Sequence, residues 1–406
     1  MGEYILRKLL CFFTYCSIAT QSFAGFDAEV GLESRFFFEE GLADQSSYHP
    51  SIRVEGAYEH FFESSDFSTS LFYRYDAEDS QRTHFDVREA LWTYVGDEWE
   101  VKAGIGKVFW GVTESRHLVD IINQSDFVES LDGEEKLGQA MFKYSTEKEW
   151  GTIDLFWLPY FRERTFAGDD GRLLVTPIAI DVDEAVYSSN AENWRGDFAI
   201  RYSHFVGDLE FAVSHFSGTS RDPVISQKVQ LTPAPQVTLF PVYDTIDQTG
   251  LELQYIYEEW LLKFEGISNS GYSGRYSAAV FGFEYTQTGI FETSADLGWI
   301  VEYLFDDRRN QKEAAKIAPH NFERDVFVGW RYALNDADSS EILGGFVYDP
   351  RSEEVMYSLE ASKRLAEDLK LNIEAVVFQG AESDQTLKTN LLRDEDYIQL
   401  ELVKYF

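Results

Sequence analysis

The last ten residues of the chain, YIQLELVKYF at 397–406, alternate apolar and polar side chains almost to the final residue. Successive side chains of an extended strand point to opposite faces, so Ile398, Leu400 and Leu402 share one face, while Gln399 lies on the other. A strand at the end of a chain needs partners on both edges. A sheet that closes on itself supplies the first strand as a neighbour of the last. The terminal stretch therefore predicts a closed sheet.

Segments with the same alternation recur from residue 26 onward. In residues 66–77, for example, Phe67 and Tyr73 lie on one face, and Ser68 and Arg74 lie on the other. Apolar side chains outward and polar side chains inward are typical of strands that cross an outer membrane. The sequence predicts an all-β, antiparallel, up-and-down transmembrane barrel of about 18 strands, with about 16 as the alternative count. The predicted strands are 26–38, 51–62, 66–77, 83–95, 98–109, 138–147, 150–160, 195–206, 208–217, 246–258, 260–269, 275–287, 290–303, 323–334, 340–349, 354–364, 368–379 and 396–406.

The connections between these segments alternate in length. Every second connection is a short turn, and the long ones all fall in the other phase, at about 39–50, 110–137, 161–194, 218–245, 304–322 and 380–395. Outer-membrane barrels have short periplasmic turns and longer extracellular loops. This phase predicts that both ends of the barrel chain are periplasmic.

The composition agrees with strands rather than with membrane helices. Aromatic residues are 16% of the chain and hydrophobic residues 44%, yet the mean hydropathy is −0.30. No stretch after the first 24 residues approaches the roughly 18 consecutive apolar residues of a membrane helix. The formal net charge of −36 argues against nucleic acid as a partner.

The N-terminal residues have the features of a secretory signal peptide. Two basic residues precede an apolar run, and Ser22-Phe23-Ala24 fits a small-x-small cleavage site. We expect residues 1–24 to be removed and residues 25–406 to form the barrel; a short membrane anchor is the alternative. The two cysteines, Cys11 and Cys16, both lie in this leader, so no disulfide is expected in the barrel.

The most distinctive stretch is VREALWTYVGDEWEVKAGIGKVFWGVTESRHLVDIINQSD at 87–126. It combines Arg-Glu-Ala, a glycine-rich strand ending in Trp-Gly, and a loop with Asp and Asn; these residues are Arg88, Glu89, Ala90, Gly104, Gly106, Trp110, Gly111, Asp120, Asn123 and Asp126. The arrangement resembles a family of porin-like bacterial outer-membrane β-barrels, although Gln124 stands where the usual Asn-Pro pair has its proline. Members of such families are channels or uncharacterised barrels, so the resemblance implies an architecture more than a substrate.

The alternation also predicts charged side chains that face the interior. The candidate pore-lining residues are Arg53, Glu55, Arg74, Arg88, Lys102, Arg201 and Arg331. Opposed charges in a water-filled pore select solutes by their field and hydrogen bonding. Ion pairs that fill a closed barrel are the alternative interpretation.

The connection at about 111–139 is far longer than a surface hairpin requires. Gly104 and Gly106, on the inward face of the preceding strand, favour close approach of another backbone. We therefore expect this loop to fold into the barrel, with a short helix at 117–122, and to narrow the pore; an ordinary extracellular loop is the alternative. The candidate constriction residues are Glu114, His117, Asp120, Asn123, Asp126 and Glu129.

The expected function is that of a porin-like channel in the outer membrane of a Gram-negative bacterium, for passive diffusion of small polar or charged solutes. A closed barrel that serves export or assembly in an envelope complex is the alternative. An outer-membrane hydrolase is a weaker one, because no nucleophile and base pair stands out, and no cofactor or metal is expected. Phe406 resembles the terminal signal read by the barrel assembly machinery. The other expected partners are outer-membrane lipids, lipopolysaccharide and further copies of the chain in a homotrimer.

Overall fold

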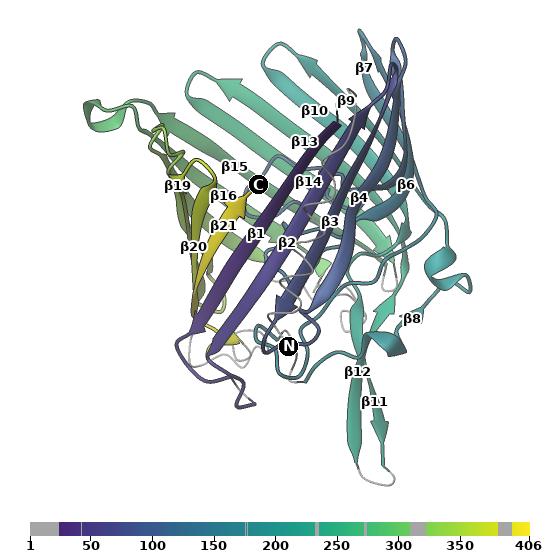
Figure 1. Ribbon diagram of the computed structural model, residues 1–406. Coiled ribbons are helices and arrows are strands. Elements are labelled where there is room, and N and C mark those ends of the chain that lie inside the picture. The colour runs from purple at the N-terminus through teal and green to yellow at the C-terminus, as the bar shows by residue number, and fades with distance from the viewer. Residues whose placement is uncertain are drawn as a thin grey trace.

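The computed structural model describes residues 24–41, 43–174, 176, 178–231, 235–271, 274–308, 322–380 and 392–406. Its main element is one antiparallel sheet of 18 strands. The sheet closes because β1 (Ala24–Phe37) pairs with β2 (Tyr48–Phe61) on one edge and with β21 (Tyr397–Tyr405) on the other (Figure 1). The predicted barrel and its strand count are confirmed. Residues 1–23 of the predicted leader lie outside the described residues.

Each barrel strand pairs antiparallel with its neighbours in chain order, apart from three short strands that stand outside the barrel. The remaining barrel strands are β3 (Ser65–Asp76), β4 (His84–Val95), β5 (Trp99–Gly106), β6 (Gln139–Lys148), β7 (Gly151–Leu158), β9 (Asp197–Val206), β10 (Leu209–Thr219), β13 (Thr245–Tyr257), β14 (Trp260–Gly271), β15 (Gly274–Gln287), β16 (Asp296–Asp306), β17 (Arg324–Ala333), β18 (Glu341–Asp349), β19 (Glu354–Ala366) and β20 (Leu369–Gln379).

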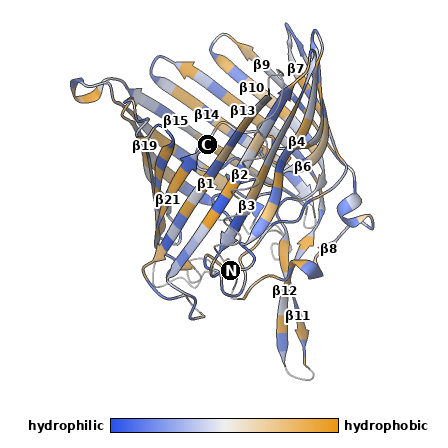
Figure 2. Cartoon of the chain, in the orientation of Figure 1, coloured by the Kyte–Doolittle hydropathy of each residue, from blue (hydrophilic) through white to orange (hydrophobic). Residues whose placement is uncertain are grey.

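The alternation of side chains has the predicted sense. Phe26 and Leu32 on β1 are 57% and 56% exposed on the outside, whereas Glu33 is 4% exposed inside. Figure 2 shows apolar and polar residues alternating along the strands. A closed sheet leaves no unpaired edge, and an outward apolar belt is stable only in lipid. Among the described residues, no helix is long and apolar enough to span a membrane.

The connections follow the predicted phase. Short turns such as 96–98 and 207–208 join strands at one end, and Phe406 lies at that end, where its N–H donates to the carbonyl oxygen of Ala28 at 2.9 Å. The phenyl ring of Phe406 is 71% exposed on the outside. The long connections gather at the opposite end (Figure 1).

Two of the long connections contain structure that the sequence did not indicate. β11 (Val224–Gln230) and β12 (Gln236–Tyr243) form a hairpin that projects beyond the barrel, and β8 (Val186–Tyr187) pairs in parallel with β12 (Figure 1). Short 3-10 helices lie at Val182–Glu184 and Glu192–Trp194 in the connection that contains β8. A third, Ile290–Glu292, lies in the short turn before β16, so the predicted strand at 290–303 begins later than expected, at Asp296.

Candidate functional site in the barrel interior

Residues 107–138, between β5 and β6, pass through the interior of the barrel; we call them the internal segment. Two glycines allow the chain to leave and rejoin the wall. Gly104 has φ +138°, and a Cβ there would lie 2.1 Å from the carbonyl oxygen of Ala90. A Cβ on Gly138 would lie 2.2 Å from the carbonyl oxygen of Val87. Only glycine permits both approaches to the backbone of β4.

One face of the internal segment is apolar and dry. Its Trp110, Leu118, Val119, Ile121 and Ile122 are at most 9% exposed. They form a single cluster with inward residues of β6 to β18, which are Met141, Phe156, Leu158, Ala199, Phe216, Ile246, Ile267, Ala278, Val280, Ile300, Leu304, Phe327 and Val347. Part of the inner wall of these strands is therefore covered by a hydrophobic core.

Two buried glutamates hold the backbone of the internal segment against the same wall. Glu265 on β14 accepts hydrogen bonds from the N–H groups of Val112 and Thr113 at 2.7 and 3.0 Å, and from the Thr113 hydroxyl at 2.7 Å. Glu302 on β16 accepts from the N–H groups of Glu114 and Ser115, both at 2.8 Å. Charged acceptors that bind amides are stronger than neutral ones.

The expected helix at 117–122 is wrong. These residues are irregular, and the N–H of Val119 donates to the carboxylate of Glu265 on β14 at 3.3 Å instead of to a carbonyl one helical turn earlier. Asn123 fixes the return of the chain: its amide donates to the carbonyls of Gly106 and Leu137 at 2.9 and 2.8 Å, and its oxygen accepts from the N–H of Val108 at 2.9 Å.

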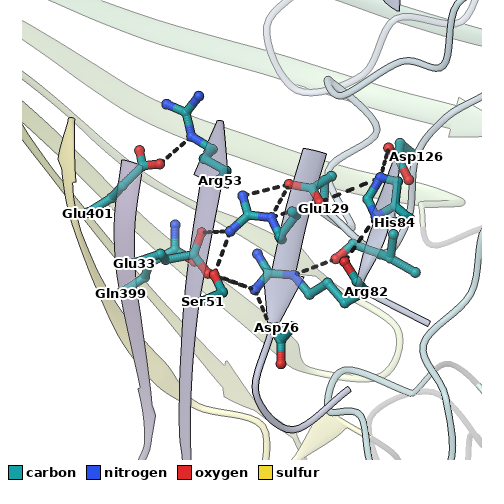
Figure 3. Close-up of polar contacts among 12 residues, drawn as sticks. Glu33, Ser51, Arg53, Asp76, Arg82, His84, Asp126, Glu129, Gln399 and Glu401 are labelled. Atoms are coloured by element: carbon teal, nitrogen blue, oxygen red, sulfur yellow. Dashed lines mark hydrogen bonds and ion pairs between the residues drawn. The ribbon is translucent and has the colours of Figure 1, made fainter. Parts of the chain in front are cut away.

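The opposite side of the internal segment is bound by arginines of β3 and β4. Arg74 contacts Glu129 at 2.7 Å and Glu33 of β1 at 2.9 Å. Arg88 contacts Asp126 at 2.8 Å and donates to the carbonyl of Lys136 at 2.6 Å. Figure 3 shows Glu33, Glu129, Asp126 and their neighbours in one connected network. Arg74 and Arg88 are 3% and 2% exposed, so both are buried against the segment.

Glu33 and Asp76 join a further arginine, Arg82, to this network. Arg82 contacts Glu33 at 2.8 Å and Asp76 at 2.9 Å, and it donates to the carbonyl of Val128 at 2.9 Å (Figure 3). His84 lies 3.3 Å from Asp126. The alternation also placed Asp76 on the inward face, but sequence reasoning did not single out Glu33, Arg82, Glu265 or Glu302, although each of these acids is a charged residue at an inward strand position.

The other predicted pore-lining residues are also paired. Arg53 lies 2.5 Å from Glu401 (Figure 3) and also contacts Glu29. Glu55 accepts from the Ser70 hydroxyl at 2.6 Å. Pairs with acids are further made at 3.3 Å by Lys102 with Glu100, at 2.9 Å by Arg201 with Glu252, and at 2.7 Å by Arg331 with Glu114. These contacts are the ion pairs of the alternative interpretation. That the same residues line a path for solutes stays a prediction.

Of the remaining predicted constriction residues, Asp120 lies 3.0 Å from Lys136. His117 lies 3.0 Å from Glu134 and 3.8 Å from Glu265. Burial opposes protonation of His117, but the hydrogen bonds and the charges of both glutamates outweigh it and raise the pKa of His117 to about 10. The imidazolium therefore ties the internal segment to β14 at neutral pH. His117 contacts carboxylates, not a hydroxyl nucleophile, and no arrangement among the described residues indicates catalysis.

The side of the internal segment that faces β19 and β20 is wet. Asp132 and Glu134 of the segment and Glu360 of β19 are exposed, although they lie inside the barrel. Glu360 and Glu374 of β20 are opposite each other in the sheet, and Glu360 is repelled by the charges of Asp132, Glu134 and Glu114. Water-accessible space therefore separates the segment from this wall.

Comparisons with known proteins agree on the fold. No protein-family model matches the chain, and no curated protein matches it in sequence. OccD3 (OpdP) of Pseudomonas aeruginosa matches with a TM-score of 0.53 and 9% identity, covering 96% of this chain and 93% of that one. Wzi of Escherichia coli, described as a carbohydrate-binding β-barrel involved in group 1 capsule assembly, matches with a TM-score of 0.54 and 10% identity, covering 100% and 88%. A variant of the Rh. blastica porin matches less closely, with a TM-score of 0.43 and 8% identity over 94% and 100%.

Identities this low show the fold alone. The chain has the fold of porin-like outer-membrane barrels, and with its closed sheet and outward apolar belt it is an outer-membrane β-barrel. The predicted architecture and location are confirmed at that level.

Proposed function

We propose that this barrel is a porin-like channel for passive diffusion of small polar or charged solutes, and that its passage runs to one side of the interior. The passage lies between the wet face of the internal segment and the inner wall of β19 and β20. The observation that carries this proposal is the exposure of Asp132, Glu134 and Glu360 to water inside the barrel.

The internal segment itself is expected to stay in place during conduction. Its five buried apolar side chains contribute roughly 1.5–3 kcal/mol each by leaving water, or on the order of 10 kcal/mol together. Opening the pore by undocking the segment would also expose Glu265 and Glu302 without their amide partners. Thermal motion populates such a state too rarely to support a steady current.

The charges that border the passage differ from those expected from the alternation alone. Arg74 and Arg88 are buried and neutralised by Glu129 and Asp126, so their field in the passage is small. Glu134 is paired with His117, but Asp132 and Glu360 make no ion pair among the described residues. A passage with such walls favours cations over anions, and polar over apolar solutes.

The test joins a conductance measurement with a disulfide. A Cβ on Gly250 of β13 would lie 3.5 Å from the Cβ of Val119, which is within the range of about 3.5–4.5 Å that a disulfide needs. The nearest other atom is the Ser214 hydroxyl, which can rotate away. The variant V119C/G250C, made without the leader cysteines Cys11 and Cys16, crosslinks the internal segment to β13 by a disulfide.

In planar bilayers, the purified barrel should conduct, and the stapled variant should conduct equally well before and after reduction. Absence of conductance from well-folded barrels would refute the channel. Conductance that appears only after reduction would instead show that the passage opens by moving the internal segment.

The second candidate is a closed barrel that serves export or assembly in an envelope complex. The dry core between the internal segment and β6 to β18 favours it, because a water-filled diffusion pore does not need an apolar interior. Wzi, a similar fold, is described as binding carbohydrate. Folded barrels that give no conductance but bind an envelope polysaccharide would support this candidate.

A further inference from the structure

A second long connection crosses the end of the barrel that carries the long loops. Residues 159–174, which we call the mouth strap, begin where β7 ends and lie on the internal segment. Thr165 donates to Asp126 at 2.7 Å, Arg162 donates to the carbonyl of Gly138 at 2.9 Å, and Arg164 stacks over Phe127 at 4.1 Å. The strap therefore forms an outer layer above the internal segment.

The far end of the strap reaches the wall of β1 and β21, on the other side of the barrel mouth from β7. Arg172 pairs with Glu395 at 3.0 Å and donates to the carbonyls of Glu39, Ser46 and Asp394 at 3.1, 3.1 and 2.7 Å. Its guanidinium lies 4.0 Å from the centre of the Phe37 ring. One side chain thus joins the strap to the β1–β2 connection and to the start of β21.

Leu173 completes this contact. It is 8% exposed and packs with Phe37 and Tyr397, with Leu131 of the internal segment beside them. Tyr397 in turn contacts Glu374, one of the acids of the proposed passage. The tip of the strap, Arg172 and Leu173, therefore lies at the outer end of the passage.

The tip is held mainly by the polar contacts of Arg172 and makes fewer apolar contacts than the internal segment. Leu173 has φ +60°, in the left-handed region that a leucine rarely adopts. Its apolar cluster has three buried members, against eighteen in the core around the internal segment. A small cavity remains beneath the tip, lined by Arg35, Arg82 and Glu129 among others. Strain, few apolar contacts and incomplete packing mark a segment that opens before its surroundings.

We propose that the mouth strap is the gate of this barrel: its tip closes the outer end of the passage when Arg172 binds Glu395 and opens the passage when that contact breaks. The inference rests on the proposed channel and adds the moving part to it. The internal segment divides the interior permanently, and the strap decides whether the remaining space is continuous with the outside.

A disulfide can lock the strap shut. A Cβ on Gly168 would lie 3.6 Å from the Cβ of Gln81 in the β3–β4 connection, within the range of about 3.5–4.5 Å for a disulfide. The variant Q81C/G168C, in the background without Cys11 and Cys16, should conduct when reduced. It should lose at least about nine tenths of its open-channel events when oxidised, and regain them with dithiothreitol. V119C/G250C is the matched control, because it staples the internal segment and should conduct in both states.

The outcomes separate the two proposals. Conductance of oxidised Q81C/G168C equal to that of the reduced form would overturn the gate and leave the channel. Absence of conductance from every variant, reduced or oxidised, would overturn the channel and the gate with it. A second variant acts in the opposite direction: Arg172→Gln should raise the open probability at least about threefold if the barrel folds, as judged by heat-modifiable migration. An unchanged open probability of folded Arg172→Gln would also overturn the gate.

Discussion

The pair Arg74 and Glu129 offers a direct measure of how firmly the internal segment is held. Arg74 is 3% and Glu129 8% exposed, and two contacts of Arg74 Nε to the carboxylate at 2.9 Å add to the 2.7 Å contact of Nη2. Arg74→Met leaves Glu129 buried without this partner; His84, at 3.9 Å, is too distant to replace it. Removing one member of a buried pair costs about 3–5 kcal/mol. That loss corresponds to roughly a 100- to 5,000-fold larger population of undocked segment.

The population of undocked segment can be measured by amide hydrogen exchange with mass spectrometry, on barrels in nanodiscs. The N–H of Asp126 donates to the carbonyl of Glu135 at 2.8 Å, and the N–H of Leu137 donates to the carbonyl of Gln124 at 2.9 Å, so peptides over 124–137 report local opening. Their exchange should accelerate by at least about 100-fold in Arg74→Met. The double variant Arg74→Met with Glu129→Gln should recover part of the loss, because no unpaired charge remains buried.

Lys404→Met is the matched control. It removes an ion pair with Asp368 in which both side chains are about half exposed, and such pairs contribute at most about 1 kcal/mol. Its exchange over 124–137 should stay unchanged. An acceleration of less than about fivefold in Arg74→Met would refute the view that this pair docks the segment.

Three further predictions concern selectivity, pH and folding. The double variant Glu360→Gln with Glu374→Gln should lower the cation-to-anion permeability ratio, taken from reversal potentials in a salt gradient, by a factor of roughly two to five. An unchanged ratio would show that the passage does not run beside these two residues. The pKa of His117 is raised from 6.5 to about 10, so its ion pairs stabilise docking fully below pH 6.5, and this stabilisation is lost as the pH rises through 10. Amide hydrogen exchange over 112–119, corrected for the intrinsic exchange rate, should therefore rise between about pH 8 and 10.5. The His117→Gln variant should not show this rise. Gly104→Ala places a Cβ at a positive φ and only 2.1 Å from a carbonyl oxygen, and should lower the free energy of unfolding by more than about 2 kcal/mol. The folded fraction, measured by heat-modifiable migration, should fall. Gly56→Ala, whose Cβ meets nothing within 4 Å, should fold normally.

The sequence predicts the barrel well because period-two alternation is a strong local signal. Leu32 outside and Glu33 inside on β1 show the rule, and the final strand supplies the closure. The interior path of the internal segment also has a local cause, since Gly104 and the length of the connection are both visible in the sequence. Its role in narrowing a passage remains a prediction.

The contacts that hold the interior together are less accessible to such reasoning. Glu265 and Glu302 bind backbone amides more than 140 residues earlier in the chain, and an amide acceptor has no sequence motif. Inward residues were expected to be polar, so Phe216 and Ile300, both at most 1% exposed inside, were not anticipated as part of a core. Arg74 and Arg88 were placed on the correct face, but alternation cannot show which carboxylate will neutralise a charge.

The dry core also constrains the order in which the molecule assembles. It joins the internal segment to wall residues as late in the chain as Phe327 and Val347, so it is complete only after β17 and β18 are present. A segment with five buried apolar side chains and two amide-binding glutamates would not thread through the mouth of a sealed cylinder. We therefore expect the segment to dock while the sheet is still open, with the pairing of β21 and β1 as the last step. In this order of assembly the internal segment acts as a template for the wall, and the pairing of β21 with β1 closes the barrel after the segment has docked.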